Sequence, residues 1–520
     1  MVNAPEYHER TEHAPSDFPD PTFRLDSETM PRPFKRYRDR SRVSLHGVRA
    51  PVLPALSVVA EAGADPLAGA AQTARDPVDA RTVASLCYYA AGVKAERDHP
   101  ADGVDRRLYY RAASCTGNLH HVDAYVVCGD LDGLDAGVYH FDPATFSLDA
   151  LREGDYRGAL AAAAGPGAGV ADAPVTLVLT SEWWRNAWKY RERTYRHAFW
   201  DSGTVLANLL GAAHAADLPA SVAAGFDDRA VADLLGVDPA TEAPLELVPV
   251  GEGASAGRAT DEPPAVEPID PATEPQPDHD RTHDLPYEAW EASALPDGES
   301  AAAWRDRARE AGPVGGVAAG DGERVPLDPV DHETEVARPL ASAIRRRRSC
   351  REFADEPLSR RKLGTVLDRA TRGAPGDWND GDAAGLQFND VYVLATDVEG
   401  VPDGSYQFHP AEGALERLGD VTSRDKTRLA LGQEWAGDAH VNVYCMTDVE
   451  AVVGELGDRG YRLAQLEAGV VLGRLYLATY AHRPLGGTGL TFFDDEVTDF
   501  LSPRGADQTP TTLFAMGVAE

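Results

Sequence analysis

At 520 residues the chain is too long for one hydrophobic core, so we expect more than one domain. Hydrophobic residues make up 43%, which argues against global disorder, while acidic residues outnumber basic ones 84 to 50, giving a net charge of −34. This charge is typical of a halophilic protein whose self-repulsion is screened by salt, and it argues against nucleic acid as a partner.

The cysteine pattern and the hydropathy favour a cytoplasmic protein that needs neither a membrane nor a metal. The five cysteines form no C-x-x-C pair, and no apolar run approaches the ~18 residues that span a bilayer. His120, His121 and Asp123 could begin a metal site, but the sequence offers no further ligands at a suitable spacing. We therefore expect no metal.

In the first half, alternating apolar residues predict strands at Ala124–Cys128 and Val175–Thr180. Val205, Leu206, Leu209 and Leu210 fall on one face of a predicted helix. The acidic, proline-rich stretch from Glu252 to Asp331 predicts an extended connector with one short helix around Ala301–Arg309. Residues 1–251 would then form one domain and residues 332–520 another.

The second half shows the same pattern. It has a predicted strand at Val441–Met446 and a helix whose apolar face carries Leu463, Leu466, Val470 and Leu477. Helices and strands alternate irregularly along each half, which favours an α+β fold over a parallel doubly wound sheet.

The two halves are an internal repeat. Residues 136–143 (AGVYHFDP) reappear as residues 403–410 (DGSYQFHP), and residues 124–127 reappear as 391–394, both shifted by 267 positions. Residues 193–196 match 459–462 at a shift of 266, and Phe226-Asp227-Asp228 matches Phe493-Asp494-Asp495 at 267. The ordered matches indicate duplication.

Several ordered segments resemble the nitroreductase superfamily, specifically its SagB-type branch of thiazoline and oxazoline oxidases. They are residues 33–35, 110–114, 185–196, 345–353, 459–462 and 489–495. The resemblance implies a central, mostly antiparallel sheet flanked by helices in each half. It also implies an intramolecular pseudo-dimer with FMN bound between the halves.

Arg347, Ser349 and Arg351 are the first candidate site, because guanidinium forks and a hydroxyl can converge on a phosphate. The alternative is a cationic cluster that offsets the dipole of a helix at Val336–Ile344. The residues resemble the family's Arg-x-Ser-x-Arg phosphate clamp, so we assign them to the FMN phosphate and name residues 347–351 the clamp segment.

The second candidate is the segment from Arg111 to Asn118, which we name the ring loop. It resembles the family loop that lines the flavin ring, with Ala113 where the proline would be. Small residues permit close approach, and polar side chains can bond the ring edge; the alternative is an ordinary turn. The polar candidates are Arg111, Ser114, Thr116, Gly117 and Asn118.

The third candidate is Gly487, Thr488 and Gly489, where the family presents backbone N–H groups to the flavin. A loose turn is the alternative interpretation. His197 falls where related enzymes place a side chain near the flavin, although a histidine in helix packing would fit the sequence equally well.

Lys189 and Tyr190 resemble the Lys-Tyr pair that azoline oxidases use as a base. Tryptophans 183, 184 and 188 could desolvate the lysine and lower its pKa, which a base at neutral pH requires. A surface lysine lying over tryptophans is the alternative.

These assignments predict an FMN-dependent oxidoreductase with hydride transfer at flavin N5. Its single composite FMN site takes the clamp segment from the second half and the ring loop from the first. The reciprocal site would be vestigial, because Arg36–Arg42 and the residues from Trp378 to Gly385 match the family poorly. The substrate would be a small molecule or a peptide, with NAD(P)H as a candidate electron donor. The alternatives are an NAD(P)H-dependent nitro or quinone reductase, a non-catalytic or weakly flavin-binding partner protein and, more remotely, a metal hydrolase.

Overall fold

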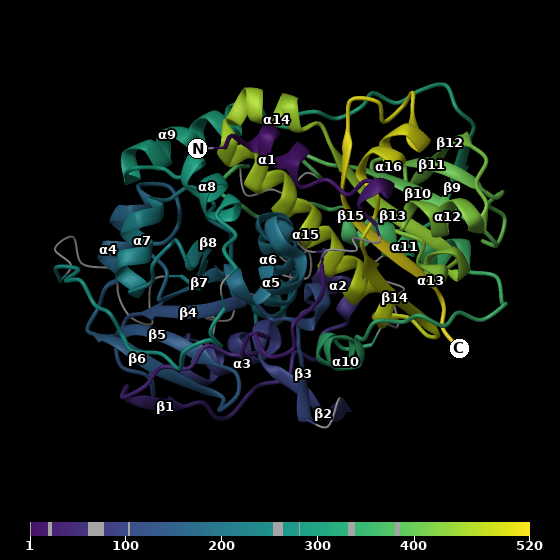
Figure 1. Cartoon of the computed structure of the whole chain (residues 1–520). Coiled ribbons are helices and arrows are strands. Elements are labelled where there is room, and N and C mark those ends of the chain that lie inside the picture. The colour runs from purple at the N-terminus through teal and green to yellow at the C-terminus, as the bar shows by residue number, and fades with distance from the viewer. Residues whose placement is uncertain are drawn as a thin grey trace.

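Two similar α+β halves lie side by side, as the computed structural model shows (Figure 1). The structure describes residues 2–18, 23–60, 77–101, 104–252, 264–279, 281–330, 338–379 and 385–520. Each half has an antiparallel sheet flanked by helices, which confirms the expected fold class.

The first sheet has six strands in the order β1-β6-β5-β4-β7-β8. Their bounds are β1 Arg42–Ser44, β4 Val122–Cys128, β5 Gly137–Asp142, β6 Ser147–Glu153, β7 Val175–Glu182 and β8 Glu242–Val250. A separate hairpin precedes the ring loop and is formed by β2 Val93–Ala101 and β3 Val104–Arg111.

The second sheet has seven strands in the order β14-β15-β13-β10-β11-β12-β9. Their bounds are β9 Arg324–Pro326, β10 Asp390–Ala395, β11 Gly404–His409, β12 Ala414–Gly419, β13 Val441–Thr447, β14 Leu485–Leu490 and β15 Thr509–Val518. The order β6-β5-β4-β7-β8 thus recurs as β12-β11-β10-β13-β15, and the repeated segments 137–142 and 404–409 form the equivalent strands β5 and β11.

The helices follow the duplication. The first half contains α1 Ala4–Arg10, α2 Ala55–Ala60, α3 Ala80–Ala91, α4 Arg157–Ala164, α5 Trp183–Tyr190, α6 Thr194–Ala215 and α7 Asp228–Leu235. The second contains α10 Leu340–Arg346, α11 Arg360–Ala370, α12 Ser423–Leu429, α13 Glu434–Asp438, α14 Val449–Leu456, α15 Asp458–Ala481 and α16 Asp494–Leu501. Residues 331–337 lie outside the described part of the chain, so of the helix expected at Val336–Ile344 only the part within α10 can be compared.

The long helices α6 and α15 pack against each other at the centre of the molecule (Figure 1). They touch at Gly203 and Gly469, where a Cβ on Gly203 would lie 2.4 Å from the carbonyl carbon of Gly469. The rings of Tyr195 and Tyr461 stack 6.4 Å apart. Both pairs join residues 266 positions apart, which places the pseudo-twofold axis between these helices.

Two reciprocal ion-pair clusters hold the halves together. Asp494 at the start of α16 accepts hydrogen bonds from Arg193 and Arg196 of the first half. Asp228 at the start of α7 accepts from Arg459 and Arg462 of the second half. Asp228 and Asp494 are therefore equivalent at a shift of 266. The sequence match at 267, which aligned Asp227 with Asp494, is wrong by one residue.

The connector is more structured than its composition predicts. Besides the expected helix, which is α9 Gly298–Ala311, it forms α8 Leu285–Ala292 and contributes β9 to the second sheet. Trp290 is fully buried and Trp304 is 3% exposed. These two tryptophans bury a large apolar area, which stabilises the connector. The average composition of the connector is acidic and proline-rich, so it does not reveal this contribution.

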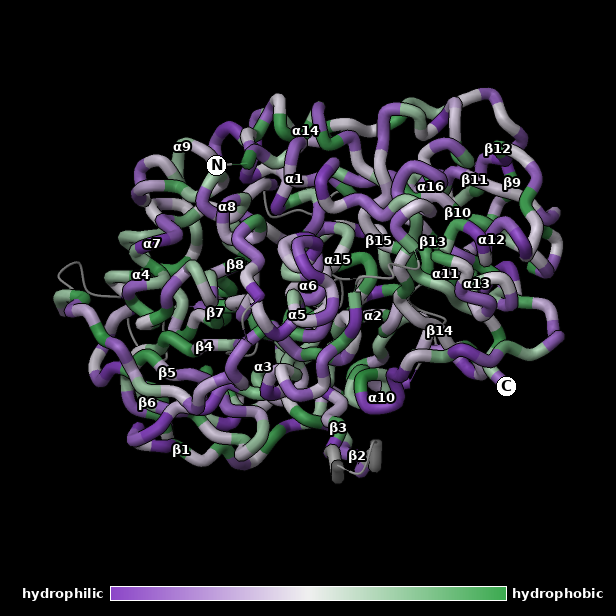
Figure 2. The backbone as a smooth tube through the Cα atoms, in the orientation of Figure 1, coloured by the Kyte–Doolittle hydropathy of each residue, from purple (hydrophilic) through white to green (hydrophobic). Residues whose placement is uncertain are grey.

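The core lies along the inner strands and the two long helices, while hydrophilic residues dominate the outer loops (Figure 2). Nearly every residue of α6 and α15 is buried. Among the described residues, no helix is both long enough and apolar enough to cross a membrane.

Candidate functional site

The clamp segment leaves α10 in an extended conformation and runs beside β14. Arg347 has ψ 130°, which ends the helix, and the N–H of Cys350 donates to the carbonyl of Gly487 at 3.1 Å. The first and third candidate regions of the sequence are therefore adjacent in space, both in the second half.

Arg347 joins the clamp segment to the ring loop of the other half. Its Nε donates to the carbonyl of Ala112 at 3.2 Å, and its Nη2 donates to the carbonyls of Arg111 and Ala113 at 2.9 and 2.8 Å. Burial lowers the pKa of Arg347. The guanidinium thus fixes the position of the ring loop. Its Nη1 takes part in none of these three bonds.

Lys94 is a contact residue that the sequence interpretation missed. It lies on β2 of the first half, and its Nζ donates to the carbonyls of Ile344 and Arg347 at the C-terminus of α10. Burial, followed by the nearby charge of Arg347, lowers the pKa of Lys94 to about 6. It is one of only five lysines in the chain, and this scarcity was the available signal.

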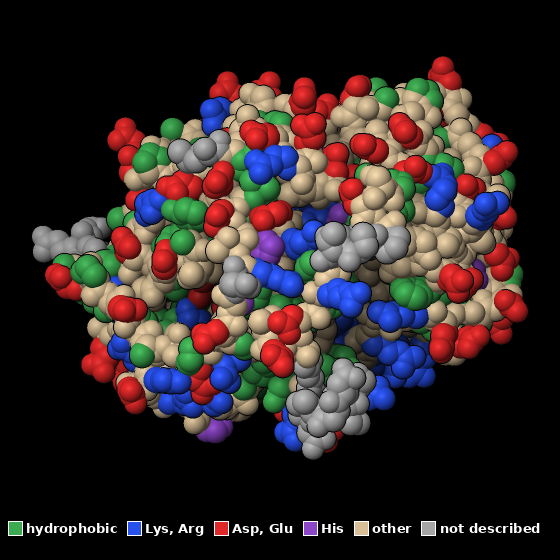
Figure 3. Space-filling view, viewed as in Figure 1, with side chains coloured by type: hydrophobic (Ala, Val, Ile, Leu, Met, Phe, Trp, Pro, Cys, Tyr) green, Lys and Arg blue, Asp and Glu red, His purple; other side chains and the backbone are tan. Residues whose placement is uncertain are grey.

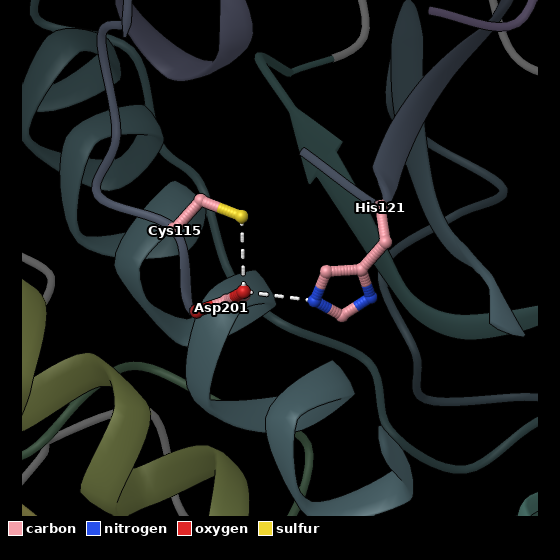
Figure 4. Close-up of side chains that lie close together, drawn as sticks. All are labelled: Cys115, His121 and Asp201. Atoms are coloured by element: carbon pink, nitrogen blue, oxygen red, sulfur yellow. Dashed lines mark hydrogen bonds and ion pairs between the residues drawn. The ribbon is translucent and has the colours of Figure 1, made fainter. Parts of the chain in front are cut away.

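A buried carboxylate on α6 anchors the ring loop. Asp201 accepts hydrogen bonds from the backbone N–H and the Oγ1 of Thr116, from the Sγ of Cys115 at 3.1 Å, and pairs with Nε2 of His121 at 2.8 Å (Figure 4). Cys115, His121 and Asp201 would be close enough to share a metal ion. Burial and Asp201 raise the pKa of the Cys115 thiol well above its usual range, and the thiol donates to Asp201. The three side chains form a hydrogen-bond network that holds the loop.

The other ring-loop candidates point in different directions. Arg111 is buried and donates to the carbonyls of Val122 and Pro33, and Asn118 donates to the carbonyl of Tyr109. The carbonyl of Ser114 accepts from Thr204 on α6 at 2.7 Å, so Ser114 stays beside the central helices. Arg111 and Asn118 thus stabilise the loop through bonds to neighbouring backbone carbonyls.

Lys189 and Tyr190 end α5 and face both the ring loop and the clamp segment. A Cβ on Gly117, whose φ is +63°, would lie 2.7 Å from the hydroxyl of Tyr190. Burial lowers the pKa of Lys189, and the charge of Arg351 in the other half lowers it further. Two cations from opposite halves therefore face each other.

His197 lies behind Tyr190 as a neutral imidazole. Its Nδ1 bonds to Oδ1 of Asn186 at 2.8 Å, and its ring meets that of Tyr190 edge-on at 4.7 Å. Burial, and then Arg193, lowers the pKa of His197 well below its usual range. The structure thus brings His197, Tyr190 and Gly117 together.

Cationic side chains gather in the hollow between α5, α10 and β14, although the surrounding surface is strongly acidic (Figure 3). Within the described residues, no carboxylate forms an ion pair with Lys189, Arg348 or Arg351. Ser349 and Arg351 are exposed beside this hollow. Uncompensated cations at the junction of two halves favour an anionic ligand there.

Comparison with known proteins agrees with this geometry. The family model described as "Nitroreductase family" matches residues 74–252 and again residues 344–518. The chain belongs to the nitroreductase family. A nitroreductase-type protein of Methanocaldococcus jannaschii is 26% identical over 189 residues, which is 34% of this chain and 90% of that protein.

One solved structure shows the same fold over the whole chain. A nitroreductase-type protein of Anabaena variabilis covers 100% of both chains with a TM-score of 0.76 and 23% identity. Another, from Desulfovibrio desulfuricans, was solved in complex with FMN; it covers 35% of this chain and 86% of its own, with 21% identity and a TM-score of 0.25.

At the position of the first half that is pseudo-equivalent to the end of β14, the chain places one of its own carboxylates. Asp377, which precedes Trp378, accepts hydrogen bonds from the N–H groups of Ala224 and Gly225, both at 3.0 Å. Nη1 of Arg305 on α9 lies 3.6 Å from Oδ2 of Asp377, and it donates to the carbonyl of Gly225. Residues 380–384, part of the segment judged a poor ring loop, lie outside the described residues.

In sequence, the first half also offers no arginine-rich counterpart of the clamp segment after α2, where residues 61–76 lie outside the described part of the chain. Pro54 and Pro339 pair across the pseudo-twofold axis, and α2 and α10 each begin at the next residue. The counterpart of the clamp segment should therefore follow α2, where residues 61–72 contain no arginine or lysine. Arg36 and Arg42, the region compared in the sequence, instead pair with Asp142 and Asp149.

Symmetry also points to a backbone pair that the sequence interpretation missed. Ala223 pairs with Leu247 as Leu490 pairs with Leu513, so Ala224 and Gly225 correspond to Thr491 and Phe492, shortly after Gly487–Gly489. Gly486 and Gly487 are required by packing, because a Cβ would meet Sγ of Cys350 at 2.8 Å or the ring of Phe514 at 2.4 Å. The signal was the match of Phe226 with Phe493 at a shift of 267, which also aligns Gly225 with Phe492.

Proposed function

We propose that the chain binds one FMN between its halves and acts as a SagB-type dehydrogenase. The observation that carries the proposal is the asymmetry of the two sites. One is filled by Asp377 and Arg305, whereas in the other the clamp arginine Arg351, which pairs with no carboxylate among the described residues, lies near Lys189 of the first half. FMN would supply a hydride acceptor at N5, and the protein would supply binding, orientation and electrostatics.

The residues fit such a cofactor. Ser349 and Arg351 are exposed beside the hollow and can hold a phosphate or a ring oxygen. In the filled site a carboxylate occupies the N–H groups of Ala224 and Gly225. The equivalent N–H groups of Thr491 and Phe492 can therefore hold negative charge in the other site.

Lys189 can take a proton from the substrate. Burial and Arg351 both favour its neutral form, which is the form that a general base needs. Burial raises the pKa of Tyr190, so its hydroxyl stays protonated and can donate a hydrogen bond. Together the two residues can remove a C–H proton and orient the substrate.

We expect the purified protein to contain one FMN per chain, and Asp377→Ala to contain one as well. Removal of the Asp377 side chain does not create a second phosphate clamp, so no second FMN should bind. It leaves the N–H groups of Ala224 and Gly225 buried without a partner, which should cost about 1–3 kcal/mol of stability each. Absorbance per chain measures the FMN content, and thermal unfolding measures the stability. Two FMN per chain in either protein would contradict the single composite site, and no FMN after reconstitution in high salt would contradict the flavoenzyme.

Lys189→Met should slow the reduction of bound FMN by a thiazoline- or oxazoline-bearing peptide by about 10²–10⁴-fold. Because the neutral lysine is the active form, the wild-type rate should rise with pH through the lowered pKa of Lys189, and the variant should lose this rise. Anaerobic bleaching of the flavin measures both. Lys362→Met, at a partly exposed lysine on α11 that bonds only to the carbonyl of Arg483 within the described residues, is the control. Unchanged peptide oxidation in the Lys189 variant would assign Lys189 a structural role, and reduction by NAD(P)H alone would favour the reductase.

A further inference from the structure

The N-terminal arm, which we define as residues 11–18, leaves α1 and runs towards α16 of the second half (Figure 1). The backbone N–H of His13 donates to Oδ2 of Asp494 at 2.8 Å, and the N–H of Asp494 donates to the carbonyl of His13 at 3.1 Å. Nδ1 of His13 lies 3.3 Å from Oγ1 of Thr491. His13 therefore lies directly beside the segment that follows β14, at the proposed FMN site.

The segment after β14 presents two adjacent N–H groups. The N–H of Phe493 donates to the carbonyl of Leu429 at 3.0 Å. Within the described part of the chain, the N–H groups of Thr491 and Phe492 donate to no acceptor. They are the equivalents of the two N–H groups that hold the carboxylate of Asp377 in the filled site. We name Thr491 and Phe492 the amide pair.

The same hydrogen bonds surround both sites, so the counterpart of His13 can be identified. Thr11 of the arm and Ser293 after α8 are equivalent, because each accepts hydrogen bonds through its carbonyl and its side-chain hydroxyl from an equivalent pair of arginines. These pairs are Arg193 and Arg196 for Thr11, and Arg459 and Arg462 for Ser293. Two residues further on, the N–H of Leu295 donates to Asp228 at 2.9 Å, as the N–H of His13 does to its own aspartate. The counterpart of His13 at the filled site is therefore Leu295.

The two counterparts differ in their side-chain chemistry. Leu295 can only pack, whereas an imidazole can donate and accept hydrogen bonds. At the filled site, the carbonyl of Gly225 accepts a hydrogen bond from Nη1 of Arg305 at 2.7 Å. At the FMN site, the equivalent carbonyl, that of Phe492, forms a hydrogen bond with the ring of His13. His13 thus forms at the FMN site the contact that Arg305 forms at the filled site.

The charge of these two residues also differs. Burial, and then the charge of Arg193, lowers the pKa of His13 to about 3, although Asp494 and the backbone of Phe492 act in the opposite direction. The ring of His13 is therefore neutral at physiological pH. Arg305, in contrast, is a permanent cation beside the carboxylate of the filled site. At the FMN site the amide pair is held in place without a fixed positive charge.

We propose that His13 is a positioning residue of the FMN site, which orients the amide pair so that its N–H groups hold the negative charge that the flavin ring gains on reduction. The inference rests on the proposed function and deepens it. His13 contacts both residues of the amide pair, and Nε2 of Gln433 donates to the carbonyl of Thr491 at 3.4 Å. Fixed backbone dipoles stabilise charge only where their orientation is maintained.

The midpoint potential of bound FMN tests the proposal. In His13→Leu, which copies the filled site, the ratio of the affinities for reduced and oxidised FMN should fall at least tenfold, which lowers the potential of a two-electron couple by about 30 mV. His13→Asn, whose amide can bond to the same groups, should recover at least half of this shift. Leu295→Ala, at the counterpart position, should leave the potential unchanged, and thermal unfolding checks that each variant is folded.

Hydrogen exchange in the FMN-free protein gives a second readout that does not need the cofactor. Exchange of residues 489–493 should be at least tenfold faster in His13→Leu than in the wild type, and it should be unchanged in Leu295→Ala. An unchanged potential or unchanged exchange in His13→Leu would overturn the role of His13, and so would an equal shift in Leu295→Ala. Failure of the wild type to bind FMN would contradict the proposed function together with this extension of it.

Discussion

Asp494→Asn is expected to lower the free energy of unfolding by about 3–5 kcal/mol, because it leaves Arg193 and Arg196 buried without their charge partner. Arg193 is 2% exposed and Arg196 is fully buried, so water cannot replace the carboxylate. Both arginines come from the first half and Asp494 from the second. The loss should therefore weaken the junction of the halves, and chemical unfolding at fixed salt measures it.

The neighbouring Asp495 provides the matched control. It is exposed on the same turn of α16, so Asp495→Asn removes the same charge and should change stability by less than about 0.5 kcal/mol. Asp228→Asn should cost as much as Asp494→Asn, since Asp228 holds Arg459 and Arg462 in the equivalent place. Equal effects of the Asp494 and Asp495 variants would show that net charge, not the buried cluster, sets stability.

The pH dependence follows from the same cluster. Arg193 and Arg196 overcome the effect of burial and hold the pKa of Asp494 well below its usual range. A carboxyl whose pKa is lower in the folded state contributes stability above its unfolded pKa of about 3.9, and that stability is lost as the pH falls. Asp494→Asn should therefore remove part of the acid sensitivity of the wild type.

The duplicated architecture could be read from the sequence because its strands carry local patterns. Residues 137–142 and 404–409 alternate in hydropathy, and they form the equivalent strands β5 and β11. The relative shift was harder to define. The two halves differ in the length of their connecting loops, so the residue shift changes from 267 in the strands β4 and β5 to 266 in the long helices. The ion pairs of Asp228 and Asp494 show that these two residues are equivalent.

The site was less predictable because several key contacts involve backbone atoms. The acceptors of Arg347 are carbonyl groups, which have no residue-specific signature. Asp377 is one of many acidic residues, and nothing in the sequence indicates that its carboxylate occupies two N–H groups of the other half. Residue type could identify the clamp segment, but not the direction in which each arginine points.

Substitution of Arg347 separates the two roles that this residue can have at the FMN site. Arg347→Lys keeps a positive charge but cannot donate in a fork to the carbonyls of Arg111, Ala112 and Ala113. If the fork positions the ring loop, Arg347→Lys and Arg347→Ala should both weaken FMN binding by about 10²-fold. This corresponds to the loss of one or two charge-assisted bonds of about 1.5–3 kcal/mol each.

Two measurements decide the outcome. Quenching of FMN fluorescence gives the affinity, and hydrogen exchange of the ring loop should speed up in both variants, since Arg347 holds three of its carbonyls. Arg360→Lys, at a partly exposed arginine paired with Asp328, should change neither. Retention of FMN affinity by Arg347→Lys would instead show that the charge of Arg347 acts on the phosphate. Lys94 would then be the residue that joins β2 to the end of α10 across the halves. The carboxylate of Asp201 would hold the ring loop in place within the first half.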